Sequence, residues 1–219
     1  MKKAILIIIA CACLALSCSS IPKRVRNAFT YCYTGTYTGI DTLININGYY
    51  SVVDSYNATS IMFYDNGLAA IGNVSYNMEQ LDKNKPLFYK EVAENPETKE
   101  AKHFYNLIDC GSYVICGDTI KIQMIYGVRS IDDNLIGMER WYKIIDKDTL
   151  QFLDAFPVTT NKKDKEDWRR SVPVFSRGGK KITFIPVPVK PQLDYFWILR
   201  EKWFWCNEQD WKNYMQRIK

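Results

Sequence analysis

Short strand-forming segments, joined in pairs by tight turns, constrain this chain more than any other feature. Residues 60–65 and 68–71 flank Asn66-Gly67, a dipeptide that accepts the positive φ angles of a hairpin turn. Three further pairs surround Gly117-Asp118, residues 146–148 and Gly178-Gly179, and residues 49–53 form another strand-like run. The pattern predicts a mainly β protein made of successive antiparallel hairpins.

Alternation within the strands predicts which faces are buried, because successive side chains of a strand point to opposite faces. In residues 119–126 one face is apolar and carries Ile120, Ile122, Met124 and Tyr126, opposite Thr119, Lys121 and Gln123. In residues 136–144 one face carries Ile136, Met138, Arg140, Tyr142 and Ile144. Arg140 therefore lies among apolar neighbours.

Arg140 has two interpretations. It is either a rim or core residue held by a carboxylate or by carbonyl groups, or the polar anchor of a ligand inside a barrel. In the second case the candidate lining residues are Tyr64, Met124, Tyr126, Arg140 and Tyr142.

The first residues have the pattern of an export signal. Lys2 and Lys3 are followed by an unbroken apolar run over 4–16, which is too short for a membrane span but fits a signal peptide. Residues 14–18, Leu-Ala-Leu-Ser-Cys, resemble the lipobox of bacterial lipoproteins, with Ala15 where Leu is usual. The resemblance implies cleavage by signal peptidase II after residue 17 and a lipid on Cys18.

The same resemblance implies a location. No Asp or acidic cluster follows Cys18, so we expect a lipoprotein of the outer membrane that faces the periplasm. Residues 18–28 are expected to be an extended tether because 19–26 lack apolar periodicity. An ordinary signal peptide that is cut elsewhere is the alternative.

Composition excludes two broad classes. The chain is 47% hydrophobic and 14% aromatic, which excludes general disorder. The formal net charge of +5 falls to +3 once Lys2 and Lys3 are removed, and no nucleic-acid-binding motif is present. We therefore expect no nucleic-acid partner.

The cysteines leave the disulfide pairing open. Cys32, Cys110, Cys116 and Cys206 remain after processing, in a compartment that permits disulfides. Four thiols allow three complete pairings, and buried unpaired thiols are an equal alternative. The spacing of Cys110 and Cys116 does not match a zinc knuckle.

Two segments interrupt the strand pattern of the domain expected over 29–190. Residues 78–106 are charged and predict an insertion with short helices, which we expect to cover one end of the barrel. Residues 191–219 are rich in aromatic side chains and end in a predicted amphipathic helix with Asn207 as its N-cap. This segment either packs on the barrel as core or offers a surface to a partner.

Several strand motifs over residues 45–155 resemble the lipocalin-like lipoproteins of Gram-negative bacteria. They are Gly48-Tyr49-Tyr50, the hairpin at 63–67, and the runs at 117–122 and 139–145. The resemblance implies an antiparallel up-and-down barrel of about eight strands. Such a barrel either holds a small apolar or amphipathic ligand or is filled by side chains and acts as an envelope interaction module.

Catalytic patterns are not found. His103 is the single histidine, which removes sites that need two or three histidine ligands and the common two-histidine mechanisms. No phosphate-binding loop or dinucleotide fingerprint occurs. We therefore expect a protein that is not an enzyme and has no metal and no cofactor.

Overall fold

Eight antiparallel strands close into a barrel in which each strand pairs with its neighbours in chain order and β8 pairs back with β1. This computed structural model describes residues 21–51, 59–73, 87–126, 135–158 and 179–218. The strands are β1 (Gly48–Ser51), β2 (Thr59–Phe63), β3 (Leu68–Asn73), β4 (Asp109–Cys116), β5 (Thr119–Tyr126), β6 (Ile136–Asp146), β7 (Thr149–Pro157) and β8 (Lys181–Pro186). The predicted mainly β, up-and-down barrel with a C-terminal helix is confirmed.

The hairpin turns lie where the sequence predicts them. Gly67 joins β2 to β3 with a φ of 93°, and Gly117 joins β4 to β5 with a φ of 63°. These are left-handed conformations that a residue with a Cβ adopts only at a cost. The β6–β7 turn lies at residues 146–148, as predicted. The strand expected at 172–175 lies outside the described residues.

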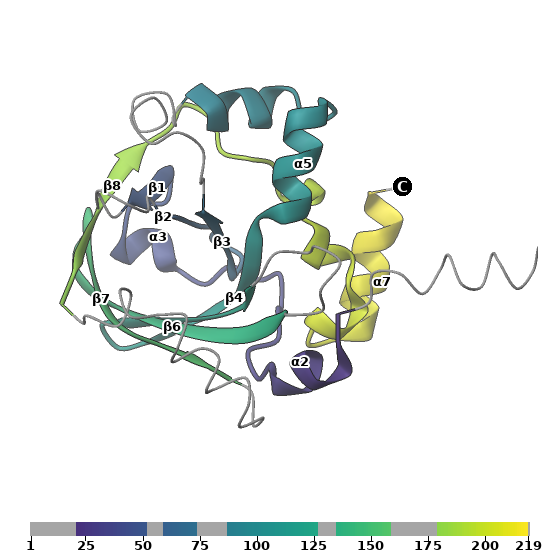
Figure 1. Cartoon of the computed structure of the whole chain (residues 1–219), viewed down its shortest axis with the longest axis horizontal. Coiled ribbons are helices and arrows are strands. Elements are labelled where there is room, and N and C mark those ends of the chain that lie inside the picture. Colours follow the sequence, from purple (N-terminus) through teal and green to yellow (C-terminus); the bar gives the residue numbers. More distant parts are fainter. Residues whose placement is uncertain (1–20, 52–58, 74–86, 127–134, 159–178, 219) are drawn as a thin grey trace, which may run out of the picture.

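The barrel interior is an apolar core that confirms the predicted inward faces. Its buried residues come from all eight strands and include Tyr50, Phe63, Ile122, Met138 and Ile182. The short helix α3 (Ile40–Leu43) lies within the ring of strands in Figure 1. Ile40 of this helix and Ile44 after it are fully buried against the same core. Helix α3 therefore closes one end of the barrel.

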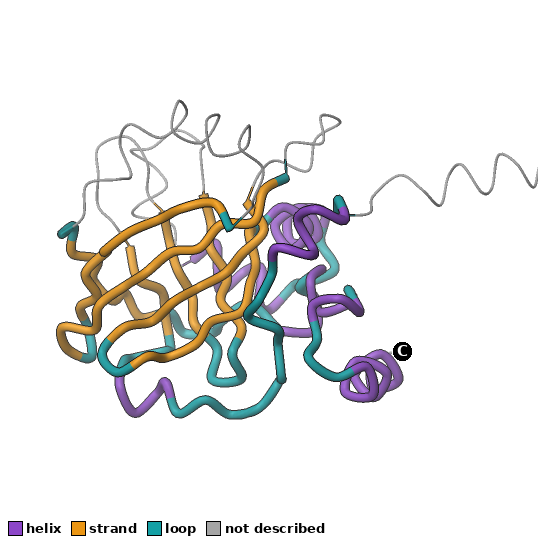
Figure 2. Tube along the Cα trace, turned by 90° about the horizontal axis from the view of Figure 1, so that it is seen from below, coloured by secondary structure: helices purple, strands orange, loops and turns teal. Residues whose placement is uncertain are grey.

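A second apolar core lies outside one wall of the barrel. Strand β1 is buried along its whole length, because its outward-facing Tyr49 is covered as well. Met62 on β2 and Ala70 on β3 also face outward and belong to this second core. Figure 2 shows the helices of this layer beside the strands. They are α2 (Lys23–Ala28), α5 (Lys99–Leu107), α7 (Glu208–Arg217), a helical segment over 87–94, and the 3-10 turns η1 (Leu193–Tyr195), η2 (Trp197–Arg200) and η3 (Lys202–Phe204).

The described part of the charged insertion does not cover a barrel end. Tyr89 lies against Tyr49 with a ring-centroid distance of 5.1 Å, and its hydroxyl pairs with the hydroxyl of Ser60 on the outer wall. Tyr105 of α5 contacts Phe196 of the C-terminal segment. The expectation of a cover over the end is therefore wrong for residues 87–107, because the apolar outer wall takes up their aromatic rings.

The segment expected to be an extended tether is partly helical. Residues 23–28 form α2, and Ile21 and Val25 are 2% and 1% exposed. Ile21 lies just before this helix and Val25 within it, and α2 docks beside β6. The sequence argument overlooked this single apolar pair. The export signal over 1–17 and Cys18 lie outside the described residues.

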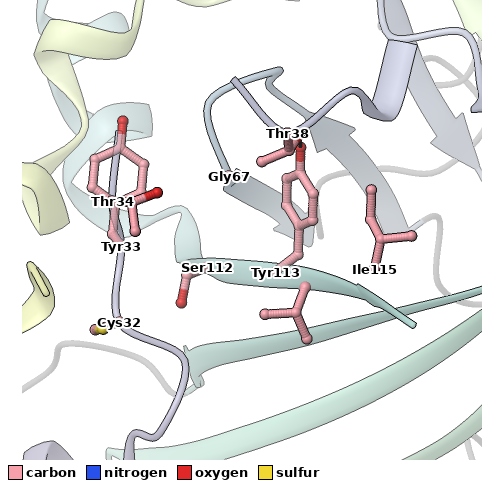
Figure 3. A pocket seen from close by; sticks show the side chains of 9 residues that line it. Cys32, Tyr33, Thr34, Thr38, Gly67, Ser112, Tyr113 and Ile115 are labelled. Atoms are coloured by element: carbon pink, nitrogen blue, oxygen red, sulfur yellow. Dashed lines mark hydrogen bonds between the residues drawn. The ribbon is translucent and has the colours of Figure 1, made fainter. Parts of the chain in front are cut away.

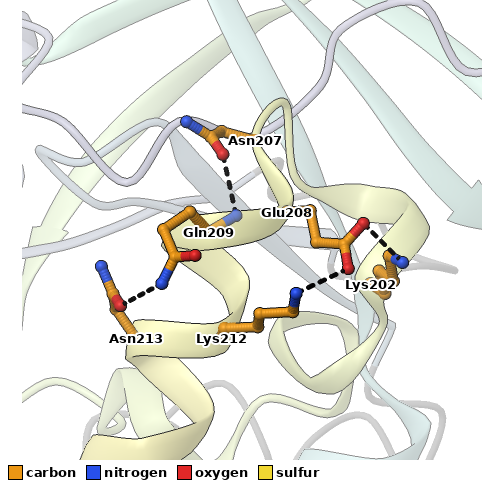
Figure 4. Close-up of polar contacts among 6 residues, drawn as sticks. All are labelled: Lys202, Asn207, Glu208, Gln209, Lys212 and Asn213. Carbon is orange, nitrogen blue, oxygen red and sulfur yellow. Dashed lines mark hydrogen bonds and ion pairs between the residues drawn. The ribbon is translucent and has the colours of Figure 1, made fainter.

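The C-terminal segment is joined covalently to the residues that precede the barrel. Cys32 and Cys206 form a disulfide, whereas Cys110 is a buried thiol and Cys116 an exposed one. Helix α7 follows directly. Its predicted cap is observed, since the Asn207 side chain accepts a 2.8 Å hydrogen bond from the Gln209 N–H (Figure 4).

Candidate functional site

Three of the predicted ligand-lining residues lie on the inner face of the barrel. Met124 on β5 is fully buried, and Arg140 and Tyr142 on β6 are 7% and 3% exposed. Arg140 lies opposite Ile122 of β5 on one side and Ala155 of β7 on the other. The structure therefore places a guanidinium group in the apolar interior, next to the small side chain of Ala155.

Arg140 and Tyr142 form a polar pair on this inner face. They are two positions apart on one strand, so their side chains project from the same side of the sheet. The guanidinium group of Arg140 lies close enough to the Tyr142 hydroxyl to act on it. Burial raises the pKa of Tyr142, and the adjacent positive charge of Arg140 partly opposes that rise. The hydroxyl therefore keeps its proton and can itself donate.

The chemistry of the pair defines what it can recognise. Arginine has five N–H donors in a planar fork and no acceptor, and the fork matches a carboxylate or phosphate. Charge-assisted hydrogen bonds of this kind are stronger than those between neutral groups, and a low dielectric strengthens them further. The pair thus offers an anion-binding point within apolar walls.

Two predicted residues do not line the described interior. Tyr64 follows the inward-facing Phe63 and turns to the outer core, where its ring contacts Phe196 and its hydroxyl donates to the Pro191 carbonyl at 2.8 Å. Its assignment to the lining was wrong because adjacent residues point to opposite faces. Tyr126 ends β5, and its side chain lies outside the described part of the chain.

The end of the barrel near α3 is sealed by hydrogen bonds as well as by apolar packing. The Tyr50 hydroxyl contacts the carbonyl groups of Asn45 and Lys147 at 3.0 and 2.7 Å. The Asn45 N–H also donates to the Lys147 carbonyl. These bonds tie the residues after α3 to the β6–β7 turn.

Sequence reasoning missed a buried polar cluster on the outer face of β5 and β6. Gln123 lies opposite the apolar face of its strand, yet Gln123 and Glu139 are only 2% and 6% exposed, because residues 29–33 cover them. The Glu139 carboxylate accepts hydrogen bonds from Tyr31 Oη (3.1 Å), Gln123 Nε2 (2.8 Å) and Trp141 Nε1 (2.5 Å). Gln123 Oε1 in turn accepts from the backbone N–H groups of Thr30 and Tyr31. This cluster holds the N-terminal segment on the barrel.

Two hollows lie beside the N-terminal segment, and Tyr33 and Thr34 line both of them. The first, about 330 Å³, lies between residues 32–38 and β4, and Ser112 and Tyr113 form its floor (Figure 3). The hydroxyl groups of Tyr113 and Thr38 lie 2.6 Å apart there. The second, about 510 Å³, lies between this segment, η1 and α7.

A lysine with an unusual environment lies near the β2–β3 turn. Lys190 Nζ donates to the Phe63 carbonyl at 2.5 Å and lies 4.0 Å from the ring centroid of Tyr64. Burial lowers the pKa of Lys190 from 10.5 to about 8. This ammonium group is therefore easier to deprotonate than that of an ordinary lysine.

The structure does not bring His103 and Cys110 into a shared site. His103 is exposed on α5, whereas Cys110 is fully buried and its thiol donates to the Ile108 carbonyl. Across the described ranges, no group of His, Cys, Asp and Glu side chains is arranged to hold a metal ion. No helix in those ranges is both long and apolar enough to cross a membrane.

Comparisons of the chain with protein-family models, with curated proteins and with solved structures give no match.

Proposed function

We propose that this chain is an exported, lipid-anchored binding protein whose barrel holds a small amphipathic molecule with an anionic head. The observation that carries the proposal is the buried Arg140–Tyr142 pair on the inner face of β6. A charged group in an apolar interior is costly, and binding sites concentrate a few polar groups among apolar walls in this way. The ligand's head would meet the guanidinium, and its apolar part would contact neighbours such as Met124 and Met138.

The location rests on the first eighteen residues. The apolar run and the lipobox-like sequence before Cys18 support export and lipidation, which would place the protein on the outer membrane facing the periplasm. A binding protein held there would meet amphipathic molecules that pass between membrane and periplasm.

A matched pair of ligands tests the barrel function. Residues 19–219, which lack the signal and the anchor, are titrated with a medium-chain fatty acid and with its methyl ester, and binding is followed by calorimetry and native mass spectrometry. We expect the acid to bind and Arg140→Met to weaken it by about 10- to 100-fold, as for a lost hydrogen bond to a charged group. The ester should bind weakly and respond little to Arg140→Met.

Arg200→Met is the matched control, because Arg200 is exposed at the end of η2, in the helical layer outside the barrel. It should bind the acid as the wild type does. Equal affinity of the acid for the wild type and for Arg140→Met, or no uptake of either ligand, would reject the barrel function.

An interaction module is the second candidate, and the half-buried tryptophans of the C-terminal segment favour it. Trp203, Trp205 and Trp211 are each partly exposed, although their indole N–H groups bond within the chain. Tryptophan is enriched at protein interfaces. Photo-crosslinkers placed at Lys202 and, as a control, at Lys181 would distinguish the two: a specific adduct at Lys202 alone favours the interaction module.

A further inference from the structure

The larger outer hollow is a separate site from the barrel interior. Its volume of about 510 Å³ lies within the roughly 300–1,000 Å³ of small-molecule sites. It is lined by the segment after the disulfide, the β2–β3 turn, η1 and α7, and none of its lining residues belongs to the inner core. What it binds is therefore independent of the ligand proposed for Arg140.

One wall of this hollow is a fixed aromatic ring. Trp205 is half-buried, and its indole N–H donates to the Leu199 carbonyl at 3.0 Å. Tyr33 and Tyr214 pack against it with centroid distances of 4.7 and 5.3 Å. A Cβ at Gly35 would lie 3.3 Å from the Trp205 ring, so the backbone passes close to it there. The ring is thus held in place before any ligand binds.

The rim of the hollow consists of planar polar side chains. Arg217 forms a 2.8 Å ion pair with Asp194, and Asp210 is exposed on α7. Asn213 Oδ1 accepts a 2.9 Å hydrogen bond from Gln209 Nε2, as Figure 4 shows, which orients the Asn213 amide. Carboxylate, amide and guanidinium groups can each bond two neighbouring hydroxyl groups of a ligand.

The charges of the lining exclude some ligand classes. Asp194 and Asp210 outnumber the single cation Arg217, and Asp194 already neutralises that cation. An anionic ligand would meet net negative charge and is disfavoured. A neutral molecule with an apolar face and many hydroxyl groups can pack on the Trp205 ring and hydrogen-bond with the polar side chains of the rim.

We propose that this hollow binds a neutral saccharide of one or two sugar units. One face of a sugar ring, which carries C–H groups, would pack on Trp205. The hydroxyl groups would bond Asp210, Asn213 and the Arg217–Asp194 pair. Thr34 and Thr36, whose hydroxyl groups lie 2.8 Å apart, add donors and acceptors on the opposite side.

Binding is tested with the mature lipidated protein in a detergent that has no sugar headgroup. The probes are glucose, galactose, mannose, N-acetylglucosamine and maltose, with glucuronate as the anionic comparator. Saturation-transfer NMR detects contact, and tryptophan fluorescence gives the dissociation constants. We expect at least one neutral sugar to bind more tightly than glucuronate.

Variants on α7 locate the site. Asp210→Ala is expected to weaken the best sugar by about tenfold or more and Asn213→Ala by about fivefold, as for charged and neutral hydrogen bonds. Gln216→Ala, an exposed amide on the same helix outside the hollow, and Arg140→Met should leave the affinity unchanged. All four variants are checked for folding by circular dichroism.

Four results would overturn the proposal. The first is that none of the neutral sugars binds. The second is tighter binding of glucuronate than of every neutral sugar. The third is that Asp210→Ala and Gln216→Ala have the same affinity. Loss of sugar binding in Arg140→Met would show that the sugar occupies the barrel instead of this hollow.

Discussion

Cys32 and Cys206 are joined by a disulfide that links the segment before the barrel to the segment after it, across 174 positions of the chain. The backbone reinforces this link, because the Tyr33 N–H donates to the Phe204 carbonyl at 2.8 Å and the Cys206 N–H to the Tyr33 carbonyl at 2.9 Å. The two ends of the domain therefore form one unit on the outer wall.

Removal of this disulfide should destabilise the protein strongly. A cross-link that closes a loop of this length restricts the unfolded chain, and the entropic contribution is about 5 kcal/mol. We expect the Cys32→Ser/Cys206→Ser double variant to lose about 3–5 kcal/mol of unfolding free energy in urea titrations. Cys116→Ser, which removes an exposed thiol, should match the wild type. Equal stability of the double variant and the wild type would contradict a stabilising link.

The buried carboxylate of Glu139 should contribute to stability through its hydrogen bonds. Glu139→Gln replaces one acceptor oxygen by an NH₂ donor, which would face either the Gln123 donor or the donors of Tyr31 and Trp141. We expect a loss of about 2–3 kcal/mol, measured by thermal and urea unfolding. Glu91→Gln, at an exposed position of the 87–94 helix, should change stability by less than about 0.5 kcal/mol. Similar values for both variants would show that the cluster is energetically neutral.

Lys190 should make stability depend on pH in the alkaline range. Its pKa is about 8 in the folded chain and about 10.5 as an ordinary lysine, so between these values the unfolded chain binds more protons. The contribution of Lys190 to the free energy of unfolding therefore rises with pH across that window. Below pH 8 the folded chain bears the full free-energy penalty for burying the charged ammonium group. Across this window the free energy of unfolding of the wild type should rise by about 3 kcal/mol relative to that of Lys190→Met.

Comparison of variants isolates this contribution of Lys190 from the buried tyrosines, which titrate at higher pH. Burial raises the pKa of Tyr105 from 10.0 to about 12, for example. The contribution of Tyr105 to the free energy of unfolding is therefore lost as the pH rises above 10, where the unfolded chain ionises first. Urea unfolding of the wild type, Lys190→Met and the exposed control Lys181→Met is measured across pH 7 to 10.5. A constant difference between the wild type and Lys190→Met over this range would refute the shifted pKa.

The lipid anchor should depend on the thiol of Cys18. Only a thiol accepts diacylglycerol as a thioether, so Cys18→Ser should abolish labelling by a palmitate analogue in cells. Cys116→Ser, which keeps the lipobox-like sequence intact, serves as the control and should be labelled like the wild type. Equal labelling of Cys18→Ser and the wild type, or a mature N-terminus other than Cys18, would disprove the assignment.

Local patterns in the sequence were sufficient for the strands and turns of the barrel, whereas its closure was expected only from the resemblance to lipocalin-like lipoproteins. Asn66-Gly67 and Gly117-Asp118 permit tight turns in almost any context, and the alternation along β5 and β6 states which side is apolar. The cap of α7 at Asn207 is likewise a contact between neighbours in the chain. Such features depend on residues a few positions apart, so one sequence reveals them.

Contacts between distant segments were decided only by the tertiary structure. The choice of Cys206 as the partner of Cys32, the outward turn of Tyr64, and the burial of Glu139 beneath residues 29–33 each depend on which segment covers the outer wall. Alternation distinguishes two faces of a strand but cannot state that both are covered. That second coverage comes from chain segments about a hundred residues away, as the Thr30–Gln123 hydrogen bond shows, and only packing in three dimensions brings them together.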